Sequence, residues 1–342
     1  MPLSITRITT ALLALALVAG ACGGTTPAAS PSAPGTAAVA TATATPRDDY
    51  PTRPITFVVG FGAGGGADVM ARALAEAAKT TLPQPVVIEN RAGAGGATAS
   101  AYVAGRPADG YTLLFAHAGS SIITPIITKQ PTLKWDAFEP VARIHAEEEW
   151  LMVQPNSQFK TVADLVTFAK ANPKKVRVAG SAIGGVDSFT VLAFEKAAGI
   201  DLEYIPFEGG GPAQLAFLGG NAEILVGNVS EFFQNIEAKK MTPFAVASEK
   251  RSTIFPDVKT LKESGFDVVY AQWRSVLAPK GTPANRIALL ADAFQKAMAA
   301  ESWKTFNKNT KAVDLYAGPA DFRTFLRSEE ERFAKIITEL GL

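Results

Sequence analysis

From Tyr50 to the C-terminus, short runs of apolar and β-branched residues alternate with longer stretches in which apolar residues recur every three or four positions. The short runs are typical of β-strands and the longer stretches of amphipathic helices. This alternation predicts an α/β fold with a mostly parallel sheet. The predicted strands are Ile55 to Gly60, Val86 to Glu89, Thr112 to Ala116, Leu151 to Gln154, Val176 to Ala179, Glu203 to Pro206, Glu223 to Val226, Phe244 to Ala247 and Val276 to Ala278. The predicted helices are Ala67 to Thr81, Thr161 to Ala171, Val186 to Ala198, Pro212 to Leu218, Glu231 to Ala238, Pro283 to Ala299 and Pro319 to Leu340.

Two of these helices carry specific signals. In the helix predicted from Ala67 to Thr81, the apolar residues Met70, Leu74 and Ala78 fall on one face. The helix that begins near Thr161 has Asp164 three positions later, the pattern of a capping box.

The N-terminus predicts export. One positive charge, Arg7, precedes the apolar run Ala11 to Ala21, which is too short to span a bilayer but typical of a signal peptide. The only cysteine, Cys22, follows this run at once and resembles the acylated cysteine of a bacterial lipobox, although Ala19 stands where a Leu is usual. Residues 1–22 are therefore interpreted as a lipoprotein-type signal peptide. An ordinary secreted protein with a spare cysteine is the alternative.

Residues 23–49 consist almost entirely of Ala, Thr, Pro, Gly and Ser. Such a composition offers nothing large enough to form a core, and it predicts a disordered tether. A tether of this kind would let a folded receptor stand away from a lipid anchor, on the outer side of the cell membrane.

Charge narrows the class of partner. The sequence contains 33 Lys and Arg and 32 Asp and Glu residues, so without Arg7 the two signs balance. A folded region without net charge argues against nucleic acid or a polybasic membrane surface as the partner, and it favours a small molecule. No later apolar run is long enough to span a membrane.

Glycine clusters stand between predicted strands and helices. They are Gly62 to Gly66, Gly93 to Gly96, Gly184 with Gly185, and Gly209 to Gly211. In an open α/β sheet such turns lie at the carboxyl edge of the strands, where ligands bind. Unpaired N–H groups at a helix start suit an anion, either a phosphate or a carboxylate.

Several segments together resemble one family. In order along the chain they are YPTRPITFVVGFGAGGGADVMAR, PVVIENRAGAGG, DGYTLLF, IPFEGGGPA with LGGNAEI, PDVKTLKESGF and APKGTP. These segments resemble the Bug family, the TctC-like extracytoplasmic solute receptors of tripartite tricarboxylate transporters. The resemblance implies a type 2 periplasmic-binding-protein fold: two α/β lobes joined by crossover strands, with a ligand cleft between them. It also implies a binding protein rather than an enzyme.

On this template the first lobe takes residues 50–148 and 275–342, and the second lobe takes residues 149–274. The hinge would lie near Glu149 to Val153 and Trp273 to Val276.

The resemblance also implies ligand-binding residues, because family members hold a ligand carboxylate on main-chain N–H groups and bridging waters of the first glycine turn. On this chain these are Phe61, Ala63, Gly64, Gly65 and Asp68, with Ser181, Gly184, Gly185, Asp187 and Ser188 from the second turn and Phe207, Glu208, Gly209 and Gly210 from the third. Four further candidates stand at strand ends or at the hinge: His117, Ser120, Asn228 and Trp273.

Structural alternatives exist for several of these. The glycines could serve only the turns, Asp68 could serve only the helix dipole, Ser120 could cap a helix, and Trp273 could pack at the hinge.

Acidic residues depart from the family pattern. Phe207 and Glu208 replace the usual Tyr and Lys of the third turn, and Glu147 to Glu149 stand beside the predicted hinge. If an acid of this run faces the cleft, its negative charge disfavours a purely anionic ligand. A receptor for an amino acid is then the alternative.

A dinucleotide-binding oxidoreductase is the competing hypothesis. Gly62, Gly64 and Ala67 satisfy G-x-G-x-x-A, and Glu89 stands where an acid could bind a ribose. The predicted export argues against it, since nicotinamide cofactors belong to the cytoplasm. Two histidines and one cysteine form no metal cluster at ligand spacing, although a carboxylate-only Ca²⁺ site stays open.

We therefore expect a receptor without catalytic residues, cofactor or metal. Its predicted partners are a small di- or tricarboxylate, the membrane subunits of a transporter and a lipid anchor at Cys22, and we expect a monomer.

Overall fold

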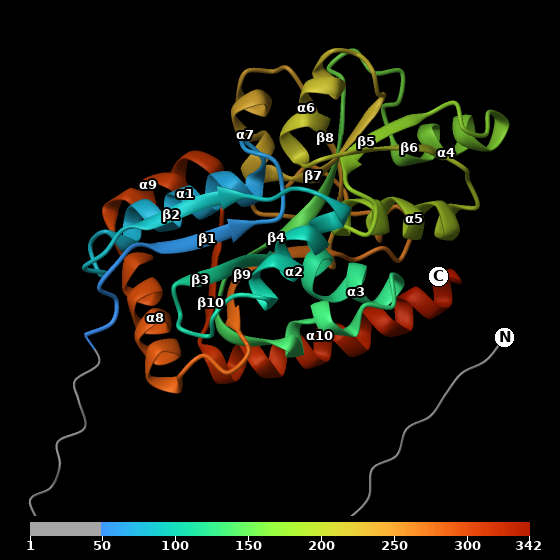
Figure 1. Cartoon of the computed structure of the whole chain (residues 1–342). Coiled ribbons are helices and arrows are strands. Elements are labelled where there is room, and N and C mark those ends of the chain that lie inside the picture. The colour runs from blue at the N-terminus through green and yellow to red at the C-terminus, as the bar shows by residue number, and fades with distance from the viewer. Residues whose placement is uncertain (1–48) are drawn as a thin grey trace, which may run out of the picture. The chain divides into compact units, whose positions relative to one another are not determined.

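The computed structural model describes residues 49–342 (Figure 1). The predicted signal peptide, the lipidation of Cys22 and all but the last residue of the predicted tether lie outside the described residues.

Ten strands of the described chain form one sheet with the order β2-β1-β3-β9-β4-β7-β5-β6, while β8 and β10 pair with β4. The strands are β1 (Ile55–Val59), β2 (Val86–Asn90), β3 (Thr112–His117), β4 (Phe138–Val153), β5 (Arg177–Ser181), β6 (Glu203–Phe207), β7 (Ile224–Asn228), β8 (Thr242–Ala247), β9 (Ala271–Pro279) and β10 (Asp314–Ala317).

Two parallel groups of strands are joined by two long antiparallel strands. Strand β1 pairs in parallel with β2 and β3, and β5 pairs in parallel with β6 and β7. All pairings of β4 and β9 are antiparallel. The sheet is therefore mixed, and the prediction of a mostly parallel sheet is wrong for the strands that cross between the two groups.

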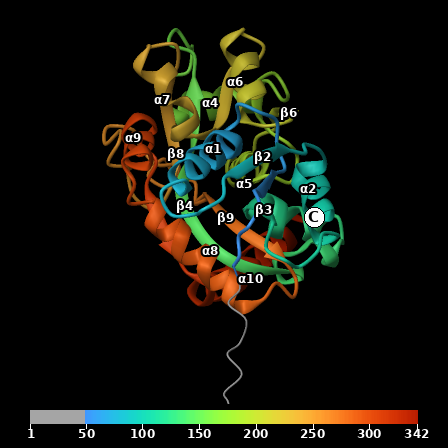
Figure 2. The same ribbon diagram turned by 60° about the vertical axis from the view of Figure 1, so that its left-hand side comes forward.

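Strand β4 belongs to both groups. Its first part, from Phe138 to Glu148, pairs with β9, and its last part, from Glu149 to Val153, pairs with β7 and β8. Figure 2 shows β4 as a long curved strand beside β9. The apolar pattern predicted only Leu151 to Gln154 because acidic residues interrupt the run.

Helices cover the two faces of the sheet. They are α1 (Gly66–Ala78), α2 (Ala97–Ala104), α3 (Thr124–Ile127), α4 (Val162–Ala171), α5 (Val186–Ala198), α6 (Gly210–Leu218), α7 (Val229–Glu237), α8 (Ala284–Ala297), α9 (Glu301–Thr310) and α10 (Pro319–Leu340), with a π-helical turn η2 (Gly119–Ile123) before α3.

Most predicted helices are confirmed, and α5 and α10 match to the residue. The capping box of α4 is present, since Thr161 Oγ1 accepts from the Asp164 N–H and the Asp164 side chain accepts from the Thr161 N–H. Helices α2, α3 and α9 were not predicted. Helix α2 is rich in alanine and shows almost no separation of apolar and polar faces.

Each parallel group of strands has its own core. On the side of β1, the ring centroids of Phe57 and Phe294 lie 5.3 Å apart, between the sheet and α8. On the side of β7, Trp150 and Phe232 are completely buried. A third cluster includes buried residues of α10 and of strands from both groups, such as Leu114 of β3 and Val226 of β7. Helix α10 crosses the lower part of Figure 1 beneath the strands. Among residues 49–342, no helix combines the length and apolar character that crossing a bilayer requires.

Candidate functional site

The first glycine turn, between β1 and α1, is fixed by Asp68. Gly64 has φ +81°, a conformation that favours glycine, and its N–H donates to Asp68 Oδ2 at 2.9 Å. Arg72 Nε donates to the same oxygen at 3.0 Å. Burial raises the pKa of Asp68, but the bonds from Arg72 and Gly64 outweigh it and the pKa lies below its usual range. Asp68 thus holds the turn in shape and uses the Gly64 N–H.

The second turn, between β5 and α5, repeats this arrangement. The Ser181 N–H donates to Asp187 Oδ2 at 2.8 Å, and the Gly184 N–H donates to Ser188 Oγ at 3.0 Å. Two of the N–H groups predicted to face a ligand are therefore already bonded within their own turn.

The turns from opposite sides of the sheet meet. The Gly62 N–H of the first turn donates to the Glu208 carbonyl of the third turn at 3.1 Å. Thr124 Oγ1 of α3 donates to the Gly184 carbonyl at 3.4 Å. The structure thus shows the two halves in contact along their carboxyl edges.

A carboxylate of the chain itself lies at the first helix start. Glu231 of α7 lies so close to Gly66 and Gly210 that a Cβ on either glycine would overlap its carboxylate. Gly66 begins α1 and Gly210 begins α6, and the Gly66 N–H bonds to Glu231. The starts of α1 and α6 therefore both lie beside a carboxyl group of the chain itself.

Arg274 of β9 binds this carboxylate and a second one. Its guanidinium donates to Glu231 Oε1 and to Glu147 Oε1, both at 2.8 Å, and to Asn228 Oδ1 at 3.3 Å. The Arg274 side chain is only 4% exposed, so these partners replace water around its charge.

Two more buried acids complete the cluster. Glu149 accepts from Asn228 Nδ2 at 2.9 Å through Oε1, while its Oε2 has no partner. Asp187 is 5% exposed and bonds to the Ser181 N–H. Four acids thus surround one arginine.

Burial shifts the protonation of these acids. It raises the pKa of Glu231 to about 7, even though Arg274 lowers it. It raises the pKa of Glu149 well above the usual range, and the charge of Asp187 adds to this rise. Buried like charges favour the neutral acid in this way.

His117 at the end of β3 presents a free donor. Its Nδ1 accepts from the Gly119 N–H at 3.0 Å, which places the proton of the neutral ring on Nε2. Nε2 is buried and has no partner. Burial, and secondly the charge of Arg274, lower the pKa of His117 to about 3. The side-chain oxygen of Gln272, Oε1, is likewise buried without a partner.

His117, Gln272, Arg274 and Glu231 lie on a cavity of about 30 Å³. A space of this size holds one or two water molecules, so a larger solute requires the turns to separate. The cavity is lined by Phe61, Gly65, Gly66, Ala67, His117, Ser181, Asp187, Gly209, Gly210, Asn228, Glu231, Gln272 and Arg274.

The structure places eight of the predicted site residues on this cavity. They are Phe61, Gly65, His117, Ser181, Asp187, Gly209, Gly210 and Asn228. Others belong to the same turns or adjoin them without lining it: Ala63, Gly64, Asp68, Ser120, Gly184, Gly185, Ser188, Phe207 and Glu208.

Trp273 lies on the opposite side of β9. Its ring packs edge-on against Phe322 and Phe325 of α10, and its Nε1 donates to Glu329 Oε2 at 3.0 Å. This position agrees with the structural alternative, in which Trp273 packs at the hinge and does not contact a ligand. Side chains alternate along a strand, so the neighbouring Arg274 faces the cavity instead.

Five lining residues were missed by the site prediction: Gly66, Ala67, Glu231, Gln272 and Arg274. The alternation of β9 was the available signal for Gln272 and Arg274. Glu231 follows Asn228, the end of β7, by three residues and so lies in the first turn of α7 at the same sheet edge.

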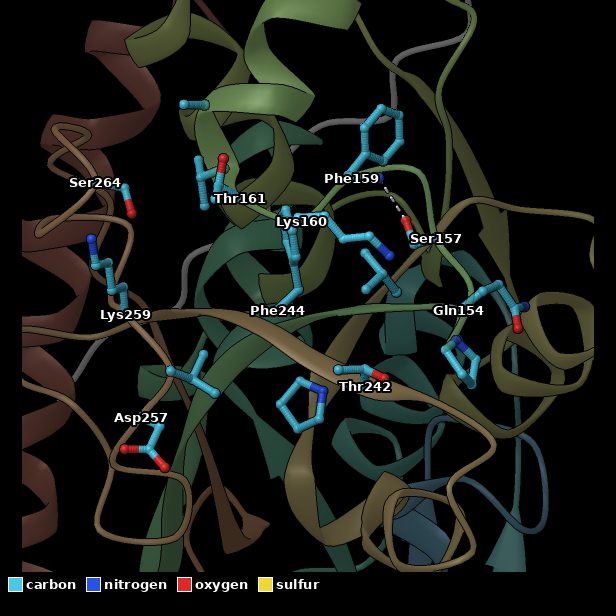
Figure 3. A pocket seen from close by; sticks show the side chains of 16 residues that line it. Gln154, Ser157, Phe159, Lys160, Thr161, Thr242, Phe244, Asp257, Lys259 and Ser264 are labelled. Carbon is cyan, nitrogen blue, oxygen red and sulfur yellow. Dashed lines mark hydrogen bonds between the residues drawn. The ribbon is translucent and has the colours of Figure 1, made fainter.

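A larger cavity of about 470 Å³ lies elsewhere, between the end of β4, the start of α4 and β8. Figure 3 shows its lining, with Lys160 and Phe244 near the middle and Asp257 and Lys259 along one side. None of the glycine turns reaches it, and none of its lining residues has an unpartnered buried polar atom. The smaller cavity is therefore the candidate site. Within residues 49–342, no group of three or more His, Cys, Asp or Glu side chains could hold a metal ion.

Comparison with known proteins gives consistent matches. Residues 70–342 match the model of the tripartite tricarboxylate transporter family receptor. Protein BugT of Bordetella pertussis is 33% identical over 86% of this chain and 91% of its own length. The periplasmic binding protein BugD is 29% identical, with a TM-score of 0.78 over 85% of this chain and 99% of that one. MatC of Rhodopseudomonas palustris, solved with bound malate, is 26% identical, with a TM-score of 0.78 over 84% of this chain and 100% of that one. The predicted type 2 periplasmic-binding-protein fold is thereby confirmed.

Proposed function

The chain belongs to the family of tripartite tricarboxylate transporter receptors, and on that premise we propose that it captures a small organic carboxylate and delivers it to the membrane subunits of such a transporter. The family is one of solute-binding receptors rather than enzymes. We accordingly assign the chain a role in binding without catalysis, outside the cytoplasm.

One observation carries the proposal. The Glu231 carboxylate lies at the starts of α1 and α6, with the Gly66 N–H bonded to it. Glycines at both positions leave room for a carboxylate, and the helix dipoles favour its charge. A related receptor of the same fold binds malate, which is a dicarboxylate.

Lobe closure is the proposed working motion. We assign residues 50–148 and 275–342 to one lobe and residues 149–274 to the other, with β4 and β9 as the hinge strands. Contacts such as Gly62 N–H to the Glu208 carbonyl would form only on closure. A solute stabilises the closed form to the extent that it makes better contacts there than in the open form.

The dinucleotide alternative has less support. The acid expected to bind a ribose, Glu89, instead accepts from Arg91 Nε at 2.6 Å.

We further propose that Cys22 carries a lipid and anchors the receptor through the tether. Replacing Cys22 with Ser should abolish metabolic labelling by palmitate and release the protein from membranes. Labelling of the variant at the wild-type level would reject the anchor. We also propose a monomer, which a dimer mass in light scattering would contradict.

A ligand screen tests the proposed function. The full chain is heated in the presence of di- and tricarboxylates, aromatic acids, acidic amino acids or dinucleotides, and its melting temperature is recorded. We expect at least one acid to raise the melting temperature, because a ligand that binds only the folded state stabilises it. Stabilisation by a dinucleotide and by no acid would overturn the proposal.

A further inference from the structure

The acids around the candidate cavity outnumber the cations. Among the described residues that line it, Arg274 is the one permanent cation, and it already donates to Glu231 and Glu147 at 2.8 Å each. Glu149 and Asp187 are two further buried acids beside this group. One positive charge therefore faces four carboxyl groups in a buried space, where unbalanced like charges are costly.

Glu231 differs from the other acids because it touches both proposed lobes. It stands on α7, and Gly210 beside it begins α6, both within residues 149–274. Gly66, whose N–H bonds to Glu231, begins α1 within residues 50–148. The Glu231 side chain is 12% exposed in this position. Separation of the lobes would take α1 away from Glu231 and admit water to its carboxyl group.

The other three acids would keep their partners in such a motion. Glu149 and Asp187 each accept a hydrogen bond from a residue of their own lobe. Glu147 and Arg274 stand on the neighbouring hinge strands β4 and β9 and are bonded to each other. The surroundings of these acids would therefore change less than those of Glu231.

The titratable groups around the start of α7 belong to five elements. They are Arg274 of β9, Glu147 and Glu149 of β4, Asp187 of α5, His117 of β3 and Asp68 of α1. His117 is neutral, since burial and secondly the charge of Arg274 lower its pKa to about 3. Asp68 is bonded to Arg72. Helix α9 also packs against α7, but its Lys304 and Lys308 are exposed, and Lys311 just after it lies over the ring of Phe233.

The same cavity offers unused polar atoms to a solute. His117 Nε2 and Gln272 Oε1 are buried without partners, and both residues line the cavity together with Glu231. Buried polar groups normally have partners, so a solute that supplies them would lie beside the acids. A carboxylate solute then adds negative charge to a space that already holds an excess of it.

We propose that closure of the lobes over a carboxylate solute takes up a proton, and that the Glu231 carboxyl group holds this proton. The proton removes one negative charge from the cluster as water is excluded. A neutral carboxyl group still accepts from Arg274 and from the Gly66 N–H through its carbonyl oxygen. On opening, water returns to Glu231 and the proton leaves. This inference rests on the proposed receptor function and adds a regulation by pH to it.

The direction of the pH effect follows from the closed structure. Burial raises the pKa of Glu231 from 4.5 to about 7, even though Arg274 lowers it. An open form that exposes the carboxyl group to water releases the proton more readily. The closed form is therefore favoured below about pH 7 and loses this preference as the pH rises through about 7. Solute affinity should fall about tenfold between pH 6 and pH 8.

Calorimetric titration of the full chain measures the proton directly. L-malate, succinate, glutarate, adipate and citrate are each titrated at pH 7 in HEPES and in Tris buffer. The two buffers differ in their heat of ionisation, so the difference in binding enthalpy gives the number of protons taken up. We expect the acid that binds most tightly to take up about half a proton or more, because Glu231 is half protonated at its closed-state pKa of about 7.

The variant Glu231→Gln assigns the proton. Gln resembles the neutral acid but cannot ionise, so proton uptake at pH 7 should fall to nearly zero. The acids themselves gain protons near pH 6, and the variant shows that share of the pH dependence alone. The tenfold loss of affinity should therefore be present in the wild type beyond the trend of the variant. Glu237→Gln, at an exposed position of the same helix, should behave as the wild type.

The outcomes separate this inference from the proposed function. Tight binding of an acid without proton uptake would overturn the linkage and leave the receptor function standing. Proton uptake that survives Glu231→Gln unchanged would also overturn it, since another group would then hold the proton. Failure of all five acids to bind at pH 6, 7 and 8 would overturn the proposed carboxylate solute and the linkage with it.

Discussion

Replacing the buried Glu231 with Gln should change how stability depends on pH. Glu231 lies in the acid cluster with its side chain 12% exposed, and Arg274, Glu147, Asp187 and Glu149 are the charged groups around it. Gln has nearly the shape of the protonated acid but cannot ionise. The difference between variant and wild type therefore isolates the cost of ionising this one carboxyl group.

The sign follows from the pKa. Because the pKa of Glu231 rises from 4.5 to about 7 on folding, the native state holds this proton more firmly than the unfolded state. Its contribution to stability is full below about pH 4.5 and is lost as the pH rises through about 7. The interval of about 2.5 pKa units corresponds to about 3 kcal/mol of unfolding free energy. Glu231→Gln should thus lie within about 1 kcal/mol of the wild type at pH 5 and exceed it by about 3 kcal/mol at pH 8.

Urea unfolding at pH 5, 6, 7 and 8 measures this difference. Tryptophan fluorescence is a suitable probe, because Trp150, Trp273 and Trp303 are completely buried in the native state. Glu237→Gln serves as the control on the same helix and should show no comparable trend. If Glu231→Gln instead loses stability relative to the wild type as the pH rises, the carboxylate is charged and stabilised by Arg274, and the reasoning from burial is wrong.

Three further substitutions test the fold, each by urea unfolding. Gly60→Ala should cost about 1–3 kcal/mol, because the new Cβ would lie 2.8 Å from the Gly96 Cα; an unchanged midpoint would contradict this close packing. Thr161→Ala should cost about 1 kcal/mol through the loss of its N-cap bond, and no loss would mean that the cap is dispensable. Trp273→Phe should cost about 1–3 kcal/mol by removing the bond to Glu329, with solute affinity unchanged. A large loss of affinity in this last variant would place Trp273 in the site.

The sequence predicted best where local patterning and tertiary burial agree. Helices α5 and α10 were both predicted to the residue, and α10 separates its apolar and polar faces clearly. Strand β4 was predicted only at its end, because Glu147 and Glu149 interrupt its apolar pattern. These acids are tolerated in a buried strand by partners distant in sequence, namely Ser230 for Glu147 and Asn228 for Glu149.

The candidate site was predicted in its turns but not in its charges. A strand, a glycine turn and a helix start are contiguous in sequence, so the turn at Gly62 to Gly66 could be recognised. Glu147, Glu231 and Arg274 lie far apart in the chain, and only the folded sheet brings them together. The period-two alternation of β9 would have favoured Arg274 over Trp273 as the residue facing the cavity.

The most direct test of the account is a crystal structure of the full chain grown with the acid that binds it most tightly. The account predicts the solute between the glycine turns, with a carboxylate oxygen about 2.7–3.2 Å from a main-chain N–H at the start of α1 or α6. It also predicts that the Glu231 carboxylate and the solute share the space at the starts of α1 and α6. A solute bound in the larger cavity beside Lys160 and Phe244, with the turns closed and unchanged, would contradict it.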